Sequence, residues 1–338
     1  MVIQRIGFAC KYMDPDQTQK KKILEEIQRP LNTRSTTVQW LNRQTREVAE
    51  QRLWDIMVHN IQSYYNLIEY VGGLPHGLRM VRLGSDVLPV YTQRDWAYYW
   101  QQADVRNYCE TYFAKVGELA RTLDVRLSMH PGQFTVLASD NADIVDRSIE
   151  EFEYHTDVIR YMGYGRHFQD FKCNVHISGR NGPAGIKAAL QRLSREARNC
   201  ITIENDENKW GIADSLELEK DLALVLDIHH HWCREAEYIS PTDDRVKRVI
   251  DSWCGVRPTM HYSVSRQPYI EDHPIDVLPD FNALIEQGYK KAKLRAHSNT
   301  MWNTAVNEWA GGFRNEFDIM VEAKSKNLAS IPFEEATR

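Results

Sequence analysis

Histidine and carboxylate side chains recur where apolar, strand-like segments of this sequence end. In chain order they are His130 in SMHPGQF, His176 in NVHISG, Glu204 in ITIEND, Asp227 with His229–His231 in VLDIHHH, His261 in TMHYS and Glu322 in IMVEAK. A lone strand-end histidine is more often a core residue than a ligand, but an unpaired buried carboxylate is costly. Packing does not explain six successive cases, and mixed imidazole and carboxylate donors suit Mn, Zn or Fe. The residues therefore predict a centre of two or three metal ions, which alone does not separate a sugar isomerase from a phosphodiesterase.

The three consecutive histidines leave two interpretations open. If the strand runs through His231, then Asp227, His229 and His231 share one face and His230 points the other way. If the strand ends near Asp227, any of the three histidines can be a ligand.

The elements that must position these residues alternate between two patterns. Longer amphipathic segments, predicted as helices, include residues 38–70, 104–123, 140–161, 184–198 and 243–253, with Asp140 as an N-cap and Pro183 in a first turn. Short segments rich in Val, Ile and Leu are predicted as strands: residues 3–10, 78–84, 125–130, 171–178, 201–205, 222–230, 259–264 and 317–323. Eight strands separated by helical segments imply parallel pairing and predict a (β/α)8 TIM barrel, with an open doubly wound sheet as the alternative.

Two segments are longer than ordinary barrel connections. We expect one domain over residues 1–338, with insertions around residues 13–37 and 271–316 on the rim at the C-terminal face of the barrel. The first contains a run of lysines and the motif NTRSTT, and the second contains several basic residues and two tryptophans.

Composition excludes some classes of protein. The chain has 338 residues, 42% of them hydrophobic, and its longest apolar runs have the length of a strand, so no membrane span is predicted. Six cysteines without a CxxC pair, and a start without a signal-peptide pattern, predict a cytoplasmic protein. A net charge of −5 argues in bulk against a nucleic-acid partner. Bound divalent ions would change that balance locally, where the acidic ligands lie.

The chain resembles the ultraviolet-damage endonucleases, which are relatives of endonuclease IV among the (β/α)8 metal enzymes. The resemblance covers most of the chain, and its most specific part is the ordered set HPGQF, ENDE and DIMVEAKSK, supported by RIGFAC, NTRSTT, LWDIMVHNI, RLGSDVLP, NVHISG, LDIHHH and MHYS. It implies hydrolysis of the phosphodiester immediately 5′ to pyrimidine dimers and related lesions, leaving a 3′-hydroxyl and a 5′-phosphate. It also implies a cluster of two or three divalent ions, typically Mn²⁺, although Zn²⁺ and Fe²⁺ suit the same donors.

The resemblance implies a specific set of ligands. It selects His230 among the three histidines, because the family's partner histidine lies three residues after its aspartate. It implies that Glu204 bridges two ions and that catalysis depends on Glu204, His130, His261 and Glu322. The full implied set is His130, His176, Glu204, Asp227, His230, His261, His273 and Glu322. No serine or cysteine nucleophile is then required, and the chain has neither a GxSxG motif nor a P-loop.

Contacts with DNA are also implied. The family inserts a Gln-aromatic pair into the duplex, which here is Gln133 and Phe134, and packing under the loop is the alternative role for Phe134. Phe8 and Tyr12 are similar candidates facing the other strand, where the family commonly has Tyr and Asn. Candidate phosphate contacts, with a solvated basic face as the alternative, are Arg34, Ser35, Thr36, Lys290, Lys291 and Lys293.

Two positions depart from the family pattern. Gln93 follows RLGSDVLP where relatives usually carry a histidine, and Thr259 stands where relatives carry a lysine, often carboxylated, two residues before the histidine of the seventh strand. Both positions line the lesion pocket or the outer metal shell in the family. We expect metal binding and incision to persist, with the lesion preference or the rate altered.

The expected partner is damaged double-stranded DNA, bound by a monomer without an organic cofactor or a membrane, in the cytoplasm at the nucleoid or in a eukaryotic nucleus. One alternative is an abasic-site endonuclease of the endonuclease IV type. Another is a damage-binding protein whose catalysis is weakened by Gln93 and Thr259, although the intact carboxylates argue against it. A sugar isomerase would leave HPGQF and NTRSTT unexplained.

Overall fold

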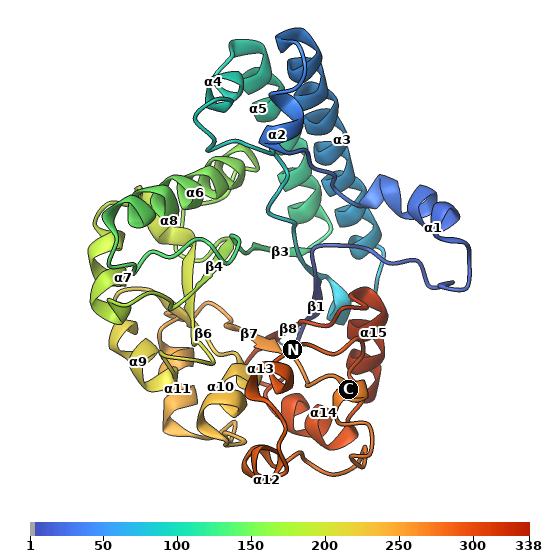
Figure 1. Cartoon of the computed structure of the whole chain (residues 1–338), viewed down its shortest axis with the longest axis vertical. Coiled ribbons are helices and arrows are strands. Elements are labelled where there is room, and N and C mark those ends of the chain that lie inside the picture. Colours follow the sequence, from blue (N-terminus) through green and yellow to red (C-terminus); the bar gives the residue numbers. More distant parts are fainter. Residues whose placement is uncertain (1–3) are drawn as a thin grey trace.

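Eight parallel strands form the centre of the molecule (Figure 1). The computed structural model describes residues 4–338, so Ile3, the expected start of the first strand, lies outside the described residues. The strands are β1 Ile6–Ala9, β2 Met80–Arg82, β3 Arg126–Met129, β4 Lys172–His176, β5 Ile201–Glu204, β6 Ala223–Val225, β7 Thr259–Tyr262 and β8 Asp318–Val321. Their order is β6-β5-β4-β3-β2-β1-β8-β7. A bridge between Asp227 and His261 joins the two ends of this order, which confirms the predicted barrel over the open sheet.

The strands are short and almost completely buried, because helices surround them on the outside (Figure 1). Parallel pairing brings all eight C-terminal ends to one face, the mouth of the barrel. In the register between β4 and β5, His176 is paired with Glu204, so the two strands end side by side. Successive side chains of a strand point to opposite faces, so alternate residues of each strand point into the barrel.

The large outer helices are α3 Arg46–Gly72, α5 Ala103–Thr122, α6 Ala142–Tyr161, α7 Gly182–Leu190, α8 Arg195–Cys200, α10 Ile228–Glu235, α11 Asp244–Asp251 and α15 Asn327–Ala336. Two predicted helices are each divided in the structure. The Thr45 side chain caps α3 and separates it from α2 Val38–Leu41, and Ser194 caps α8 and separates it from α7. The N-cap of α6 is Asn141 rather than Asp140, whereas Pro183 does lie in the first turn of α7.

Both long segments contain extra helices. Residues 13–37 include α1 Lys21–Gln28 and the short η1 Arg29–Leu31, and Figure 1 shows α1 projecting from the body. Residues 271–316 include α12 Phe281–Glu286, α13 Lys291–Leu294 and α14 Thr304–Gly311. Phe281, Leu284 and Leu294 of this second segment form a small separate core with Trp232 and Ile270. The remaining short elements are η2 His76–Leu78, α4 Ala97–Trp100, α9 Ile212–Ser215, η3 Leu216–Leu218 and η4 Gln267–Tyr269.

The opposite end of the barrel, which we call the floor, contains a fully buried aspartate. Asp318 begins β8, and its two oxygens accept hydrogen bonds from Arg257 Nε at 2.7 Å and Arg126 Nη1 at 2.6 Å. The backbone N–H of Arg5 donates a further hydrogen bond at 2.9 Å. The floor carboxylate is therefore fully paired. Within the described chain, no helix has the length and apolar character needed to cross a membrane.

Candidate metal centre

The predicted residues meet at the mouth of the barrel. His176 and Glu204 are the last residues of β4 and β5, and His261 lies within β7. His130 and Glu322 directly follow β3 and β8, and Asp227 lies two residues beyond β6. The barrel thus brings together side chains that are up to 192 residues apart in the sequence.

Glu204 lies at the centre of this cluster and is completely buried. Its Oε2 is 3.1 Å from His261 Nδ1 and 3.5 Å from His130 Nε2. Asn174 also donates a hydrogen bond to Oε2, and Thr202 Oγ1 donates to Asn174 Oδ1 at 2.8 Å, which fixes the amide. Burial opposes ionisation of Glu204, but the neighbouring His261 and His176 outweigh it and hold its pKa well below the usual range.

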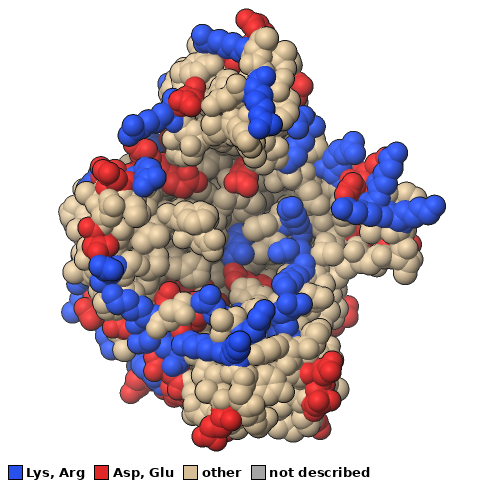
Figure 2. Space-filling model, in the orientation of Figure 1, with Lys and Arg blue, Asp and Glu red and all other residues tan. Residues whose placement is uncertain are grey.

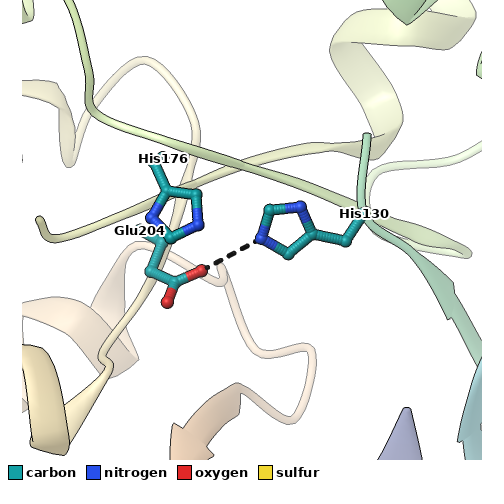
Figure 3. Close-up of side chains that lie close together, drawn as sticks. All are labelled: His130, His176 and Glu204. Atoms are coloured by element: carbon teal, nitrogen blue, oxygen red, sulfur yellow. Dashed lines mark ion pairs between the residues drawn. The ribbon is translucent and has the colours of Figure 1, made fainter. Parts of the chain in front are cut away.

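Two sets of donor atoms overlap at this glutamate. One set is His130, His176 and Glu204, shown in Figure 3, and the other is Glu204, Asp227 and His261. Within each set one ligand atom per residue lies within 4.8 Å of the others. Glu204 is therefore the one carboxylate common to both sets.

Three buried atoms of the second set have no hydrogen-bond partner among residues 4–338: Glu204 Oε1, Asp227 Oδ2 and His261 Nδ1. Unpaired buried polar atoms are rare and cost about 1–3 kcal/mol each. All three atoms can donate a lone pair to a cation. The residues present therefore fit a group of divalent ions.

The structure selects one of the three consecutive histidines. β6 ends at Val225, and Asp227 caps α10 because its Oδ1 accepts a hydrogen bond from His230 N at 2.7 Å. The interpretation in which the strand runs through His231 is therefore wrong. His230 Nδ1 lies 3.3 Å from Glu204 Oε1, whereas His229 stacks on Trp232 and His231 contacts Glu237. Burial alone would lower the pKa of His230, but Asp227, Glu204 and Glu207 raise it to about 9.

The last two implied ligands have different outcomes. Glu322 joins the cluster, with Oε1 3.4 Å from His261 Nδ1 and an ion pair to Arg82. His273 does not join it, since its Nε2 lies 2.9 Å from the carbonyl oxygen of Val277 on an outer loop. His297, which the sequence did not single out, has its Nδ1 3.8 Å from Glu322 Oε2 instead.

The path of the second insertion explains why His297, and not His273, lies beside Glu322. Ser298 N donates to Val264 O, and Lys324 N donates to Ser298 O, both at 2.9 Å. The chain therefore re-enters between the ends of β7 and β8 directly after His297. No pattern around His273 or His297 in the sequence reveals this path.

Lys172 is a second residue that sequence reasoning missed. It is buried, and its Nζ lies 2.7 Å from His261 Nε2. Burial lowers the pKa of Lys172 to about 7. A usable signal was present, because Lys172, Asn174 and His176 alternate with apolar residues along β4 and so share its inner face. Thr259 is buried at the position where the family resemblance implies a lysine. In this chain the lysine that contacts His261 is Lys172, which lies on β4.

The expected lesion-probing residues divide into two groups. Gln133 and Phe134 form the tip of a turn closed by a hydrogen bond from Thr135 N to Gly132 O at 2.9 Å, and Phe134 is 84% exposed. That exposure excludes packing under the loop. Phe8 is only 2% exposed within β1, so its predicted contact with DNA is wrong. The ring of Tyr12 is half-buried against Tyr70, with 4.8 Å between ring centroids.

The candidate phosphate contacts also differ in their surroundings. Lys290 and Lys293 are exposed at α13 and Lys291 is half-buried. Figure 2 shows Lys and Arg side chains around the central hollow, including its rim beside α13. Arg34 is half-buried and donates to Asp55 O at 2.9 Å, while Ser35 is exposed and Thr36 half-buried. Gln93 is exposed, and its own carbonyl oxygen accepts hydrogen bonds from Trp96 N and Ala97 N.

Comparison with known proteins yields a consistent group. The family model described as UV-endonuclease UvdE matches residues 4–335. A UV DNA damage endonuclease from Bacillus thuringiensis subsp. konkukian is 23% identical over 310 residues, covering 88% of this chain and 86% of that protein. A UV-damage endonuclease from Schizosaccharomyces pombe is 26% identical over 343 residues, covering 96% of this chain and 49% of that protein. The crystal structure of SacUVDE shares the fold, with a TM-score of 0.73 and 20% identity over 98% of this chain and 97% of that one.

Proposed function

This chain belongs to the UV-endonuclease UvdE family, and on that premise we propose that it is a DNA-repair endonuclease acting on UV photoproducts. The proposed reaction is hydrolysis of the phosphodiester immediately 5′ to the lesion, leaving a 3′-hydroxyl and a 5′-phosphate. The observation that carries the proposal is the pair of donor sets sharing Glu204, at the same barrel mouth as the exposed Gln133–Phe134 turn.

The metal centre would be held by the residues that meet around Glu204. One group of donors is His130, His176 and Glu204, and the other is Glu204, Asp227 and His261, with Glu322, His230 and His297 beside them. Divalent ions bound there, which we propose to be Mn²⁺, would neutralise phosphoryl oxygens, activate a water and stabilise the leaving alkoxide.

The protein's own residues prepare these donors. Asn174 and Thr202 hold the Glu204 carboxylate in one orientation. Lys172 contacts the far nitrogen of His261, which leaves Nδ1 directed at Glu204 and Glu322. Such outer partners orient ligands and typically affect metal affinity or activity 10–100-fold.

Lesion recognition is proposed for the turn that carries Gln133 and Phe134. A duplex that loses a base from its stack needs a planar side chain to fill the gap, and unstacking costs a few kcal/mol per step. An aromatic ring that is already 84% exposed loses no internal packing when it enters DNA. The lysines at α13 and the loop of Arg34, Ser35 and Thr36 would bind phosphates on either side of the lesion.

The proposal is tested with labelled duplexes that carry one thymine dimer, one abasic site or no damage, each incubated with the chain and Mn²⁺. We expect incision of the dimer duplex at its 5′ side, with a 3′ end that a polymerase extends. Incision of the abasic duplex alone would support the endonuclease IV type of activity, and binding without incision would support a damage-binding protein. Reloading the chelated protein with Mn²⁺, Zn²⁺ or Fe²⁺ separately tests the identity of the metal.

A further inference from the structure

Lys326 lies at the mouth of the barrel but belongs to neither donor set. It connects β8 to α15, four residues after Glu322, and is half-buried. Burial lowers its pKa, and the ionisable groups that act on it next are Cys10, Arg82 and Glu322. Lys326 follows the C-terminal end of β8, which is hydrogen-bonded to β1, so its backbone lies on the β1–β8 side of the mouth.

The backbone of Lys326 adopts a conformation that normally requires glycine. Its φ of 52° and ψ of −121° lie outside the left-handed helical region and within the mirror image of the extended region. A side chain held in such a conformation costs about 1–3 kcal/mol, and such residues cluster at functional sites. Lysine rather than glycine at this position therefore needs an explanation.

Hydrogen bonds on both sides of Lys326 maintain the strained conformation. Before it, Lys324 N donates to Ser298 O at 2.9 Å and Ser325 N donates to Asn299 O at 3.0 Å. After it, the buried Asn327 side chain accepts from Met13 N at 2.7 Å and donates to Met13 O at 2.8 Å. The surroundings thus fix where the lysine side chain begins.

The ammonium group itself has no partner among the described residues. Among residues 4–338, no ion pair or hydrogen bond involves Lys326 Nζ, whereas the neighbouring Arg82 is paired with Glu322. A half-buried cation without an internal anion, held by a strained backbone beside a nuclease centre, is suited to an anion that arrives with the substrate. In DNA that anion is a backbone phosphate.

We propose that Lys326 is a phosphate-binding residue, which holds a backbone phosphate of the incised strand on the β1–β8 side of the metal centre. The identity of the anion rests on the proposed function. In this role the side chain contacts substrate through Nζ, and the strained turn fixes the point from which the side chain extends.

The test compares four variants of the full chain: Lys326→Ala, Lys326→Arg, Lys326→Gly and the control Lys324→Ala, which removes an exposed lysine two residues away. We expect Lys326→Ala to slow single-turnover incision of a dimer duplex about tenfold, with arginine restoring most of the rate. The plot of log affinity against log salt concentration for duplex binding should lose about one unit of slope in Lys326→Ala. Mn²⁺ affinity should not change.

Lys326→Gly distinguishes the effect of losing the ammonium charge from the effect of relieving the backbone strain. We expect it to incise as slowly as Lys326→Ala but to unfold about 1–2 °C higher than the alanine variant, because glycine removes the strain. Wild-type salt dependence and incision rate in Lys326→Ala would overturn the proposal, and so would a wild-type chain that does not bind duplex DNA. If the wild type binds duplex without incising it, while Lys326→Ala still loses the salt slope, the proposed activity fails and the phosphate contact stands.

Discussion

The two ends of this barrel each bury carboxylates, but they treat them in opposite ways. At the floor, Asp318 accepts hydrogen bonds from two guanidinium groups and a backbone N–H. At the mouth, Glu204 and Asp227 are equally buried, yet each keeps one oxygen without a hydrogen-bond partner among the described residues. Their neighbours are mainly imidazoles rather than arginines.

This difference separates a structural charge from a functional one. A buried carboxylate that is fully paired by its own protein has no capacity left for a ligand. One with an unpaired oxygen beside imidazole nitrogens retains that capacity, and the fold bears the cost of burying it. Glu322, which follows β8, lies between these two cases, because Arg82 pairs with one of its oxygens while His261 and His297 lie beside it.

The largest expected effect is at the mouth. Glu204→Gln removes the carboxylate common to both donor sets, so we expect single-turnover incision with Mn²⁺ to fall by about 10³-fold or more. The metal-free variant should unfold at a lower temperature than wild type, since the lowered pKa of Glu204 means that the fold stabilises its negative charge. The matched control is Glu207→Gln in the same ENDE segment, which should retain activity within about tenfold. Near-normal turnover of Glu204→Gln would remove the proposed centre.

The corresponding change at the floor should affect stability instead of activity. Asp318→Asn leaves Arg126 and Arg257 without their carboxylate, and breaking such a buried network typically costs about 3–5 kcal/mol in the free energy of unfolding. Urea denaturation measures the loss. The control Asp124→Asn removes the exposed partner of Arg5 and should cost less than about 1 kcal/mol. If Asp318→Asn abolished incision in fully folded protein, the comparison between the two ends would fail.

Metal binding should depend on pH through His230. Its pKa of about 9 means that at neutral pH the imidazole is protonated and must lose that proton to bind a cation. Mn²⁺ affinity, measured by calorimetry, should therefore rise up to about tenfold per pH unit between pH 6.5 and 9. In the metal-free chain the sign is reversed, because the raised pKa stabilises the fold fully below about pH 6.5 and this contribution is lost towards pH 9. His230→Gln should flatten the pH dependence, whereas His231→Gln should not.

The smallest effect concerns Phe134. Because its ring is already exposed, Phe134→Ala should change the free energy of unfolding by less than about 0.5 kcal/mol. It should lower the ratio of incision rates on dimer and undamaged duplexes several-fold. The buried Phe8→Leu is the complementary control, which should reduce stability and leave that ratio unchanged. An unaltered ratio in Phe134→Ala would mean that the exposed ring has no part in lesion recognition.

Much of the candidate centre could be predicted from the sequence because its residues lie at or near the C-terminal ends of strands. Once the strands alternate with helices, parallel pairing brings His130, His176, Glu204 and His261 together without further information. Phe8 shows the limit of this reasoning, since a position close to a strand end does not reveal whether the residue lies inside the strand. The alternation of Lys172 and Asn174 with His176 carried information that a search for metal ligands alone overlooks.

The rest depended on long-range paths of the chain. His297 replaces His273 beside Glu322 because the insertion returns through hydrogen bonds to Val264 and Lys324, whose positions no local pattern encodes. The choice of His230 required the end of a strand and the start of a helix to fall within two residues of Asp227. Helix capping by Asp227 itself decides that boundary.

The bridge between Asp227 and His261 has a consequence for how the barrel holds together. Seven neighbouring strand pairs are joined by two or more registered residue pairs, whereas β6 and β7 are joined by this bridge and the hydrogen bond from His261 N to Leu226 O at 2.9 Å. Both bridge residues are proposed ligands of the same cation. A cation bound by both residues would thus link β6 to β7, the strand pair with the fewest registered residue pairs. The ions proposed for catalysis would then also help to close the barrel. The amide proton of His261 would then exchange with solvent more slowly in the loaded enzyme than in the metal-free chain.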